Sequence, residues 1–410
     1  MSDDDEPSEI DLLNAEVNQL KQILTGVETA KDTPDECRTK LATYCQLKGG
    51  QDGFMKADPG LEEKNVFHSS KGVNKSAGGG EGGETNDVEE YEYRLPPPVE
   101  KTYDPEHEYL SPLRHFSDVS DPSRPDADTA FFFHVPRSGG STVKTILGKC
   151  LILVQASEVG VRDGHGADPI LQVVDVQESR FVNVDTTTVP GIQRAIDLGL
   201  VRSGLADVIV SSYFHEAAAM FDLDHQGRAF VVMRDPIDRA TSMYYHRVKT
   251  LGNLDATTTI EDYAQGNGIE NNWMCRFLAN RMAGELTKED LDQAKEVLKT
   301  KFLIGFLDDL DEFVHQMMAF NGWKYSDDET AKMKQEDCVK ELTSGGTNAN
   351  AYEYEIPKRG SQAHALISWQ TQFDSKLYAY AKELFDQQSK EWGTKDRKKA
   401  LKKEKKKKAG

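Results

Sequence analysis

The hydrophobic positions of this chain gather between residues 128 and 390, where short apolar runs alternate with stretches of helical periodicity. Apolar runs bounded by polar turns are typical of buried strands, and helical periodicity marks residues 285–316 and 367–388. Strands that alternate with helices predict an α/β fold, in which a central parallel β-sheet is flanked by helices. The strand candidates are TAFFFHVP at 129–136, Arg180–Val184, Asp207–Ser211, Arg228–Met233 and FLIGF at 302–306.

A short amphipathic helix is predicted within the acidic N-terminal segment, residues 1–48. Its apolar positions are spaced by 3, 4, 3 and 4 residues, at Ile10, Leu13, Val17, Leu20 and Leu24. The pattern covers fewer heptads than a coiled coil usually has. A helix that docks on its own domain and a homodimer formed through this helix therefore both stay open.

The remaining segments have compositions that disfavour independent folding. Residues 49–127 are rich in Gly, Ser, Asp and Pro, with GGGEGG at 78–83, so they bury too little apolar surface to offset the entropy of ordering. They predict a low-complexity linker and then a Pro-rich lead-in that lies over a domain. Residues 391–410 are dominated by lysine and predict a disordered tail. The predicted domain is thus 128–390.

Charge and cysteine content narrow the class of protein. The net charge is -19, and the stretch 395–408 alone carries +8, which leaves -27 for the rest. A body this acidic argues against nucleic acid as the main ligand, because neutralising phosphates requires basic residues. The five cysteines form no CxxC pair, so reduced structural thiols are expected. The chain as written has neither a signal peptide nor a transmembrane run, which predicts a cytoplasmic location.

A Gly- and Ser-rich loop follows the first predicted strand, within FFFHVPRSGGSTVKTIL at 131–147. Adjacent glycines let the backbone turn tightly beside a ligand, and free N–H groups at the next helix start favour an anion. The loop predicts a phosphate site, although an ordinary strand-to-helix turn has the same outline. It is no Walker A loop, since no lysine follows its second glycine. The candidate residues are Arg137, Ser138, Gly139, Gly140, Ser141 and Thr142.

A second strand, turn and helix is predicted in FVVMRDPIDRATSMYYHR at 230–247. Arg234 comes at the strand's carboxyl end, where α/β sheets bind ligands, and Pro236 suits the first turn of a helix. Arg234 and Ser242 are therefore placed to hold one phosphate, from the strand end and from the helix. Taken alone, a surface cluster of ion pairs explains the same residues.

Together the two stretches resemble the sulfotransferases that use 3'-phosphoadenosine 5'-phosphosulfate (PAPS), specifically the carbohydrate type with its heparan sulfate 2-O and 6-O relatives. The family's phosphosulfate loop is similar to FFHVPRSGGST at 132–142, and its 3'-phosphate element is similar to RDPIDRATSMYYH at 234–246. Weaker similarities follow at 271–280, 302–314 and 369–385. The resemblance covers roughly 130–388 and implies a sulfotransferase domain with a P-loop-like phosphate site.

The resemblance implies a role for each matched residue. Residues 137–142 would hold the 5'-phosphosulfate, and Arg234 with Ser242 the 3'-phosphate, while a hydroxyl, expected on a glycan, accepts the sulfuryl group. Such a transfer has a loose, anionic transition state that cations and N–H donors stabilise, so no metal is expected. Arg137 stands where the family carries a lysine, and it can act only electrostatically because it keeps its proton.

The general base is expected to be a histidine. His215 follows the strand at 207–211, two residues beyond the position of a histidine in the 2-O type, where Tyr213 stands here. His165, in RDGHGAD, is the second candidate. Relatives of the 6-O type place a base in the helix after the phosphate loop, where Lys144 lies, so that arrangement is not expected.

Two other functions stay open. One is a P-loop NTPase or kinase of similar topology, which the missing GK[ST] sequence disfavours. The other is a catalytically inactive protein that keeps the fold and recognises a partner through its N-terminal helix. Location is open too, because the resemblance implies the Golgi lumen if an anchor precedes this chain.

Overall fold

The computed structural model describes residues 105–266, 271–345 and 354–409. The chain divides into two compact units, residues 1–89 and 90–410, and every described residue belongs to the second. The acidic segment 1–48, its predicted helix and the linker up to residue 104 lie outside the described residues. The homodimer expected through that helix therefore stays a prediction.

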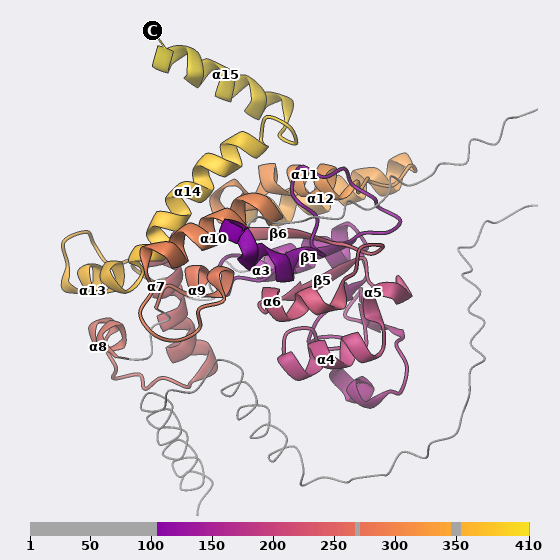
Figure 1. Cartoon of the computed structure of the whole chain (residues 1–410), viewed down its shortest axis with the longest axis horizontal. Helices are drawn as coiled ribbons and strands as arrows, with labels where there is room; N and C mark the ends of the chain where they lie inside the picture. Colours follow the sequence, from indigo (N-terminus) through magenta and orange to yellow (C-terminus); the bar gives the residue numbers. More distant parts are fainter. Residues whose placement is uncertain (1–104, 267–270, 346–353, 410) are drawn as a thin grey trace, which may run out of the picture. The chain divides into compact units, whose positions relative to one another are not determined.

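A seven-stranded sheet in the order β3-β4-β2-β5-β1-β6-β7 forms the centre of the described domain (Figure 1). All neighbouring strands are parallel except β3 and β4, which are antiparallel. This confirms the predicted α/β class. The strands are β1 (Thr129–Phe133), β2 (Gln155–Ala156), β3 (Val173–Val176), β4 (Ser179–Val182), β5 (Val208–Ser211), β6 (Gly227–Met233) and β7 (Phe302–Phe306).

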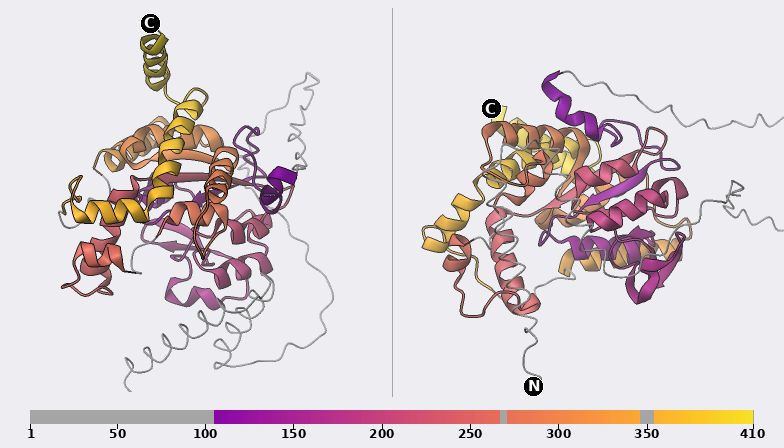
Figure 2. Two further views of the ribbon diagram at one scale, coloured as in Figure 1. Left: turned by 60° about the vertical axis from the view of Figure 1, so that its left-hand side comes forward. Right: turned by 60° about the horizontal axis from the view of Figure 1, so that its bottom comes forward.

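Helices cover both faces of the sheet (Figures 1 and 2), and alternation along the strands gives each face its own core. On β1, Phe131 and Phe133 join the core under α4, α9, α10 and α14, whereas Phe132 joins the core under α3, α11 and α12. The α-helices are α3 (Gly140–Thr145), α4 (Val189–Asp197), α5 (Leu200–Ser203), α6 (Phe214–Ala217), α7 (Pro236–His246), α8 (Ile260–Gln265), α9 (Trp273–Ala279), α10 (Lys288–Lys301), α11 (Leu310–Asn321), α12 (Glu329–Gly345), α13 (Gln362–Gln370), α14 (Gln372–Gln388) and α15 (Lys395–Ala409).

Short helical segments complete the fold. Two of them, η3 (Ile146–Cys150) and η6 (Arg247–Leu251), are π-helices that continue directly from α3 and α7. The others are 3-10 helices, namely η2 (Pro105–Leu113), η4 (Arg162–Ala167), η5 (Ala218–Met220) and η7 (Leu307–Asp309). No helix among the described residues is both long enough and apolar enough to cross a bilayer.

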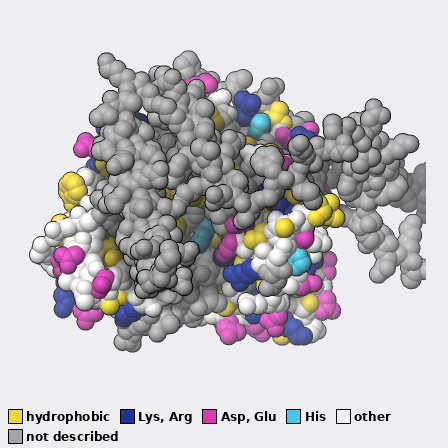
Figure 3. All heavy atoms as spheres, turned by 90° about the horizontal axis from the view of Figure 1, so that it is seen from below, with side chains coloured by type: hydrophobic (Ala, Val, Ile, Leu, Met, Phe, Trp, Pro, Cys, Tyr) yellow, Lys and Arg dark blue, Asp and Glu magenta, His cyan; other side chains and the backbone are white. Residues whose placement is uncertain are grey.

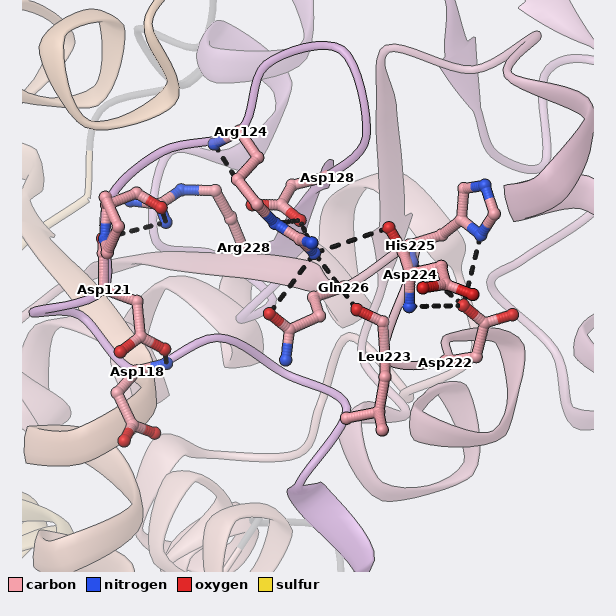
Figure 4. A network of polar contacts seen from close by, with 11 residues as sticks. Asp118, Asp121, Arg124, Asp128, Asp222, Leu223, Asp224, His225, Gln226 and Arg228 are labelled. Atoms are coloured by element: carbon pink, nitrogen blue, oxygen red, sulfur yellow. Dashed lines mark hydrogen bonds and ion pairs between the residues drawn. The ribbon is translucent and has the colours of Figure 1, made fainter. Parts of the chain in front are cut away.

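The Pro-rich lead-in packs against the domain from residue 108 onward. Phe116 is fully buried, and its backbone bridges to the first residue of β6. Farther on, Arg124 Nη2 lies 2.6 Å from Asp128 Oδ1, with both side chains almost completely buried (Figure 4). Arg228 of β6 donates to the carbonyl of Asp121 at 3.2 Å. Buried polar groups therefore fix the lead-in to the first residues of the sheet.

The C-terminal segment 391–410 differs from its predicted disorder, because α15 covers most of it. Thr394, just before the helix, is held by two bonds to Glu312 of α11, from its backbone N at 2.9 Å and its Oγ1 at 2.7 Å. The same Oγ1 accepts from the backbone N of Arg397 at 3.2 Å. An anchored cap followed by good helix formers explains why this lysine-rich stretch is helical.

Two cysteines form a disulfide, so the expectation of reduced thiols is wrong for this pair. Cys150 at the end of η3 is bonded to Cys338 of α12, at a sequence separation of 188 and with 5.5 Å between their Cα atoms. Pairs this distant in sequence leave no spacing signal. Cys275 is free and buried, and burial raises the pKa of its thiol to about 12.

Candidate functional site

The predicted phosphate loop joins the end of β1 to the start of α3. Gly139 has φ 89°, in the left-handed region that disfavours residues with a Cβ. A Cβ on Gly140 would overlap the imidazole of His134. Gly139 is therefore required by the backbone conformation and Gly140 by the neighbouring His134 ring, and Arg137, at φ 65°, shares the left-handed conformation. The chain reverses direction in this loop, directly before the free backbone N–H groups at the start of α3.

Two hydroxyl side chains of the loop are buried. Ser138 is 1% exposed and Thr142 2% exposed. The Oγ of Ser138 is buried and has no hydrogen-bond partner among the described residues. Buried polar atoms in folded proteins almost always have partners, so an oxygen-rich ligand in this loop would satisfy Ser138. The donor set fits a phosphate or sulfate group.

The second predicted element joins β6 to α7. Asp235 caps α7 by accepting from the backbone N of Ile237 at 2.9 Å, and Pro236 occupies the first helical position. Arg234 lies between the strand and this cap, partly exposed. Ser242 is fully buried on α7. The local fold thus presents a guanidinium from the strand end and a hydroxyl from the helix, as predicted.

The two elements touch each other. Arg137 Nε donates to Ser242 Oγ at 3.0 Å, and Arg234 Nη1 donates to the backbone carbonyl of Arg137 at 3.3 Å. They meet because β1 and β6 are adjacent parallel strands, whose carboxyl ends lie at one edge of the sheet. Residues about a hundred positions apart in sequence therefore form one polar site.

Tyr354 joins this site, and the sequence reasoning missed it. Its hydroxyl accepts from Arg234 Nη2 at 2.9 Å, and its ring stacks on Tyr245 of α7 with centroids 5.0 Å apart. The residue precedes α13 and lies in no strand or helix, so no periodicity points to it. It fixes one edge of the Arg234 guanidinium.

The two histidine candidates make different contacts. His215 Nε2 lies 3.0 Å from the carbonyl of Leu278, so it must carry the hydrogen and donate. Burial lowers the pKa of His215, which keeps the ring neutral. His165 lies in η4 with its Nδ1 3.1 Å from Asp168 Oδ2. No contact described for either imidazole involves the phosphate loop, and His215 has only Nδ1 left to accept a proton.

A second cluster, beside the phosphate loop, was not predicted. Lys144 of α3 places its Nζ 2.7 Å from Glu158 Oε1, and Gln155 of β2 donates to the Lys144 carbonyl at 3.0 Å. Glu158 Oε2 is buried without a partner among the described residues. We name Lys144, Glu158 and the neighbouring His134 the α3 cluster. Because β2 is only two residues long, no apolar run marks Glu158 as a residue beyond a strand end.

Electrostatics set the protonation states of the α3 cluster. Burial opposes ionisation of Glu158, but the charge and hydrogen bond of Lys144 outweigh it, so the pKa of this carboxyl lies below its ordinary value. Burial, and then the charge of Lys144, lower the pKa of His134 to about 4. At neutral pH the cluster therefore holds a carboxylate, an ammonium and a neutral imidazole. The carboxylate and the neutral imidazole are both able to accept a proton there.

Comparisons with known proteins add little to this geometry. No family model matches the chain, and no curated protein matches it. Among solved structures, the chain is similar to mouse sulfotransferase SULT7A1 complexed with PAP, with a TM-score of 0.31 and 14% identity over 72% of this chain and 93% of that one. Because this TM-score is low, the function proposed below rests on the site.

Proposed function

We propose that this chain is a sulfotransferase that moves the sulfuryl group of PAPS to a hydroxyl, with a carbohydrate as the acceptor class. The observation that carries the proposal is the contact between Arg137 and Ser242, which joins two anion-binding elements at neighbouring strand ends. Two such elements suit a nucleotide with phosphate groups at separate positions of one ribose. The contiguous phosphates of ATP would need only the loop, which disfavours the NTPase alternative.

The division of binding roles follows from the positions of the residues. The loop from Ser138 to Thr142 supplies backbone N–H groups and buried hydroxyls for the 5'-phosphosulfate. Arg234 and Ser242 supply a charged fork and a hydroxyl for the 3'-phosphate. Arg137 lies between them, so its guanidinium is placed to neutralise charge on the leaving phosphate oxygen.

Glu158 is the general base in this proposal. The acceptor oxygen forms a bond to sulfur while the bond from sulfur to the phosphate oxygen breaks, and the electron pair stays on that phosphate as adenosine 3',5'-bisphosphate. Glu158 takes the acceptor proton, because it is ionised and lies beside the phosphate-loop helix. Lys144 holds the carboxylate in place. His215 and His165 stay as competing candidates for the same step.

The disulfide supports an oxidising compartment, such as the lumen of the secretory pathway, as the place where this domain folds. Disulfides persist there and are rare in the cytosol. The bond between Cys150 and Cys338 joins two helices of one domain, so it belongs to the folded state.

Titration calorimetry with adenosine 3',5'-bisphosphate, without magnesium, tests the nucleotide site. Wild type should bind, and Arg234→Ala should weaken Kd about ten-fold or more, since a charged hydrogen bond is worth roughly 1.5 to 3 kcal/mol. Ser242→Ala should weaken it less. Arg202→Ala, which removes an exposed arginine paired with Asp222, is the matched control and should leave Kd unchanged. A folded wild type that does not bind would refute the proposal.

Transfer of labelled sulfate from PAPS to glycans tests catalysis. Glu158→Gln should abolish turnover while nucleotide Kd stays near the wild-type value, because the carboxylate acts on the acceptor. His215→Ala and His165→Ala should retain turnover, and its loss in either would move the base to that residue. A wild type that binds the nucleotide but sulfates no acceptor would favour the inactive interaction protein.

A further inference from the structure

The strongest charge concentration among the described elements lies on α15. Its sequence, KDRKKALKKEKKKKA, holds ten basic residues and two acidic ones within 15 positions. The rest of the chain carries -27. On the face seen in Figure 3, by contrast, Lys and Arg side chains are interspersed with Asp and Glu. α15 is thus strongly positive, whereas the rest of the chain is strongly negative.

The first two turns of α15 are fastened to the domain. Arg397 Nη2 lies 2.7 Å from Asp386 Oδ1 of α14, and its guanidinium lies over the ring of Phe385, 5.1 Å from the centroid. Leu401 is 9% exposed. These contacts fix the direction in which the helix leaves the body, whereas Lys402 and Lys403 are exposed to solvent. Lys402 and Lys403 are therefore presented on a positioned helix.

We propose that α15 binds a polyanionic polysaccharide, and that it holds the acceptor polymer at a distance from the transfer site. The second half of this statement rests on the proposed function, whereas the first does not. Lysine is a compact cation that suits sulfate and carboxylate groups without fixed geometry. An acidic enzyme that acts on an anionic polymer needs a basic contact of this kind to overcome repulsion by its own body.

The composition of α15 disfavours insertion into a lipid interface and base-specific recognition of nucleic acid. A helix that lies in a membrane interface needs an apolar face, but Leu401 is turned into the protein and the other apolar residues of α15 are alanines. Helices that read DNA use Arg, Asn or Gln on base edges. The helix has a single arginine, Arg397, which is paired with Asp386.

The position of α15 indicates how it would act on a polymer. α13 packs against α7, which carries Ser242, and α14 leads from α13 to α15 (Figure 1). The 17 residues of α14 span about 25 Å at 1.5 Å each. A disaccharide cannot bridge that length, but a long polysaccharide can contact both places. Binding at α15 would then raise the local concentration of acceptor groups at the site.

Binding to immobilised heparin, a sulfated polysaccharide, tests the first half of the proposal. The exchange Lys402→Gln, Lys403→Gln and Lys406→Gln in one variant should weaken Kd about ten-fold at about 0.15 M salt. The slope of log Kd against log salt should become shallower by nearly three units if all three lysines contact the polymer, since each lost contact removes a little under one. A wild type that heparin does not retain at this salt concentration would overturn the proposal.

A matched variant distinguishes binding by α15 from binding by positive charge elsewhere on the surface. Lys288→Gln, Lys334→Gln and Lys340→Gln together remove the same charge from exposed positions on α10 and α12. This control should bind heparin almost as wild type does, and equal weakening in both variants would contradict the proposal. Duplex DNA and phosphatidylserine vesicles serve as competing ligands. Tighter binding of either, dependent on the α15 lysines, would assign the helix to that ligand instead.

The length of the acceptor tests the second half. In sulfate transfer, the α15 variant should raise KM about ten-fold for a long polysaccharide and leave KM for a disaccharide unchanged. Equal changes for both acceptors would refute action at a distance. The two proposals can fail independently. If the proposed function is wrong, wild type will not bind adenosine 3',5'-bisphosphate. Its retention on heparin still tests binding by α15.

Discussion

Reduction of the disulfide should destabilise the domain measurably. Cys150 ends the helix that continues from the phosphate loop, and Cys338 lies on α12, so the bond closes a loop of 188 positions. In the chain-entropy model, a closed loop of this length lowers the free energy of the folded state relative to the unfolded chain by about 5 kcal/mol. Native disulfides that are removed typically cost about 2 to 5 kcal/mol, so we expect a loss within that range.

Thermal unfolding with and without dithiothreitol measures this loss. At roughly 2 °C of Tm for each kcal/mol in a large domain, wild type should lose about 4 to 10 °C on reduction. Cys338→Ser should show the lower Tm without reductant and no further change with it. Cys275→Ala, which alters the free buried thiol, is the control. It should still respond to dithiothreitol as wild type does.

Two results would refute this reasoning. The first is an unchanged Tm after reduction in a sample whose thiols have all been shown to react with an alkylating reagent. The second is a peptide map of the oxidised protein in which Cys150 and Cys338 are both found as free thiols.

Three further perturbations have definite expected outcomes. The pKa of His134 is about 4 in the folded state, against 6.5 for an exposed histidine, so between these pH values only the unfolded chain binds the proton. Urea unfolding should therefore show the free energy of unfolding falling by up to about 3 kcal/mol as pH drops from 6.5 to 4, and His134→Asn should remove this effect. Gly140→Ala should cost about 1 to 3 kcal/mol in the same assay, because its Cβ overlaps the His134 ring, and an unchanged midpoint would contradict the packing. Arg124→Ala should cost about 3 to 5 kcal/mol, since it leaves the buried Asp128 carboxylate unpaired, and a loss below 1 kcal/mol would show that the network of Figure 4 contributes little.

The strands that are buried on both faces of the sheet could be predicted from the sequence. β1, β5, β6 and β7 are buried at every residue, so each is a continuous apolar run that the sequence displays directly. β2 has only two residues, and β3 at the sheet edge alternates between exposed and partly buried positions. Neither has a run long enough to detect. The disulfide and the cap on α15 depend on tertiary partners, which sequence spacing does not encode.

The site was predictable to the extent that it is made of contiguous residues. The loop after β1 and the turn after β6 each carry their candidate phosphate-binding groups within a few positions, so both could be identified from the chain. Glu158 and Tyr354 contribute through contacts with Lys144 and Arg234. Those contacts arise only when separate segments pack together. The histidine bases stay predictions, because no described contact joins either of them to the loop and His215 Nε2 lies against the carbonyl of Leu278 on α9.

Arg137 is the position where the chain departs from the family it resembles, and its surroundings suggest why an arginine is accommodated. Its backbone carbonyl accepts from Arg234 and its Nε donates to Ser242, so this one residue connects both anion-binding elements. A guanidinium has five donors in a rigid fork, so it can keep the bond to Ser242 while other N–H groups face a ligand. A lysine ammonium has three donors, but all of them are on one nitrogen, so it lacks the widely spaced, coplanar N–H groups of this fork. Arg137 thus forms a fixed bridge between the two candidate phosphate-binding elements, and unlike a lysine it keeps its proton.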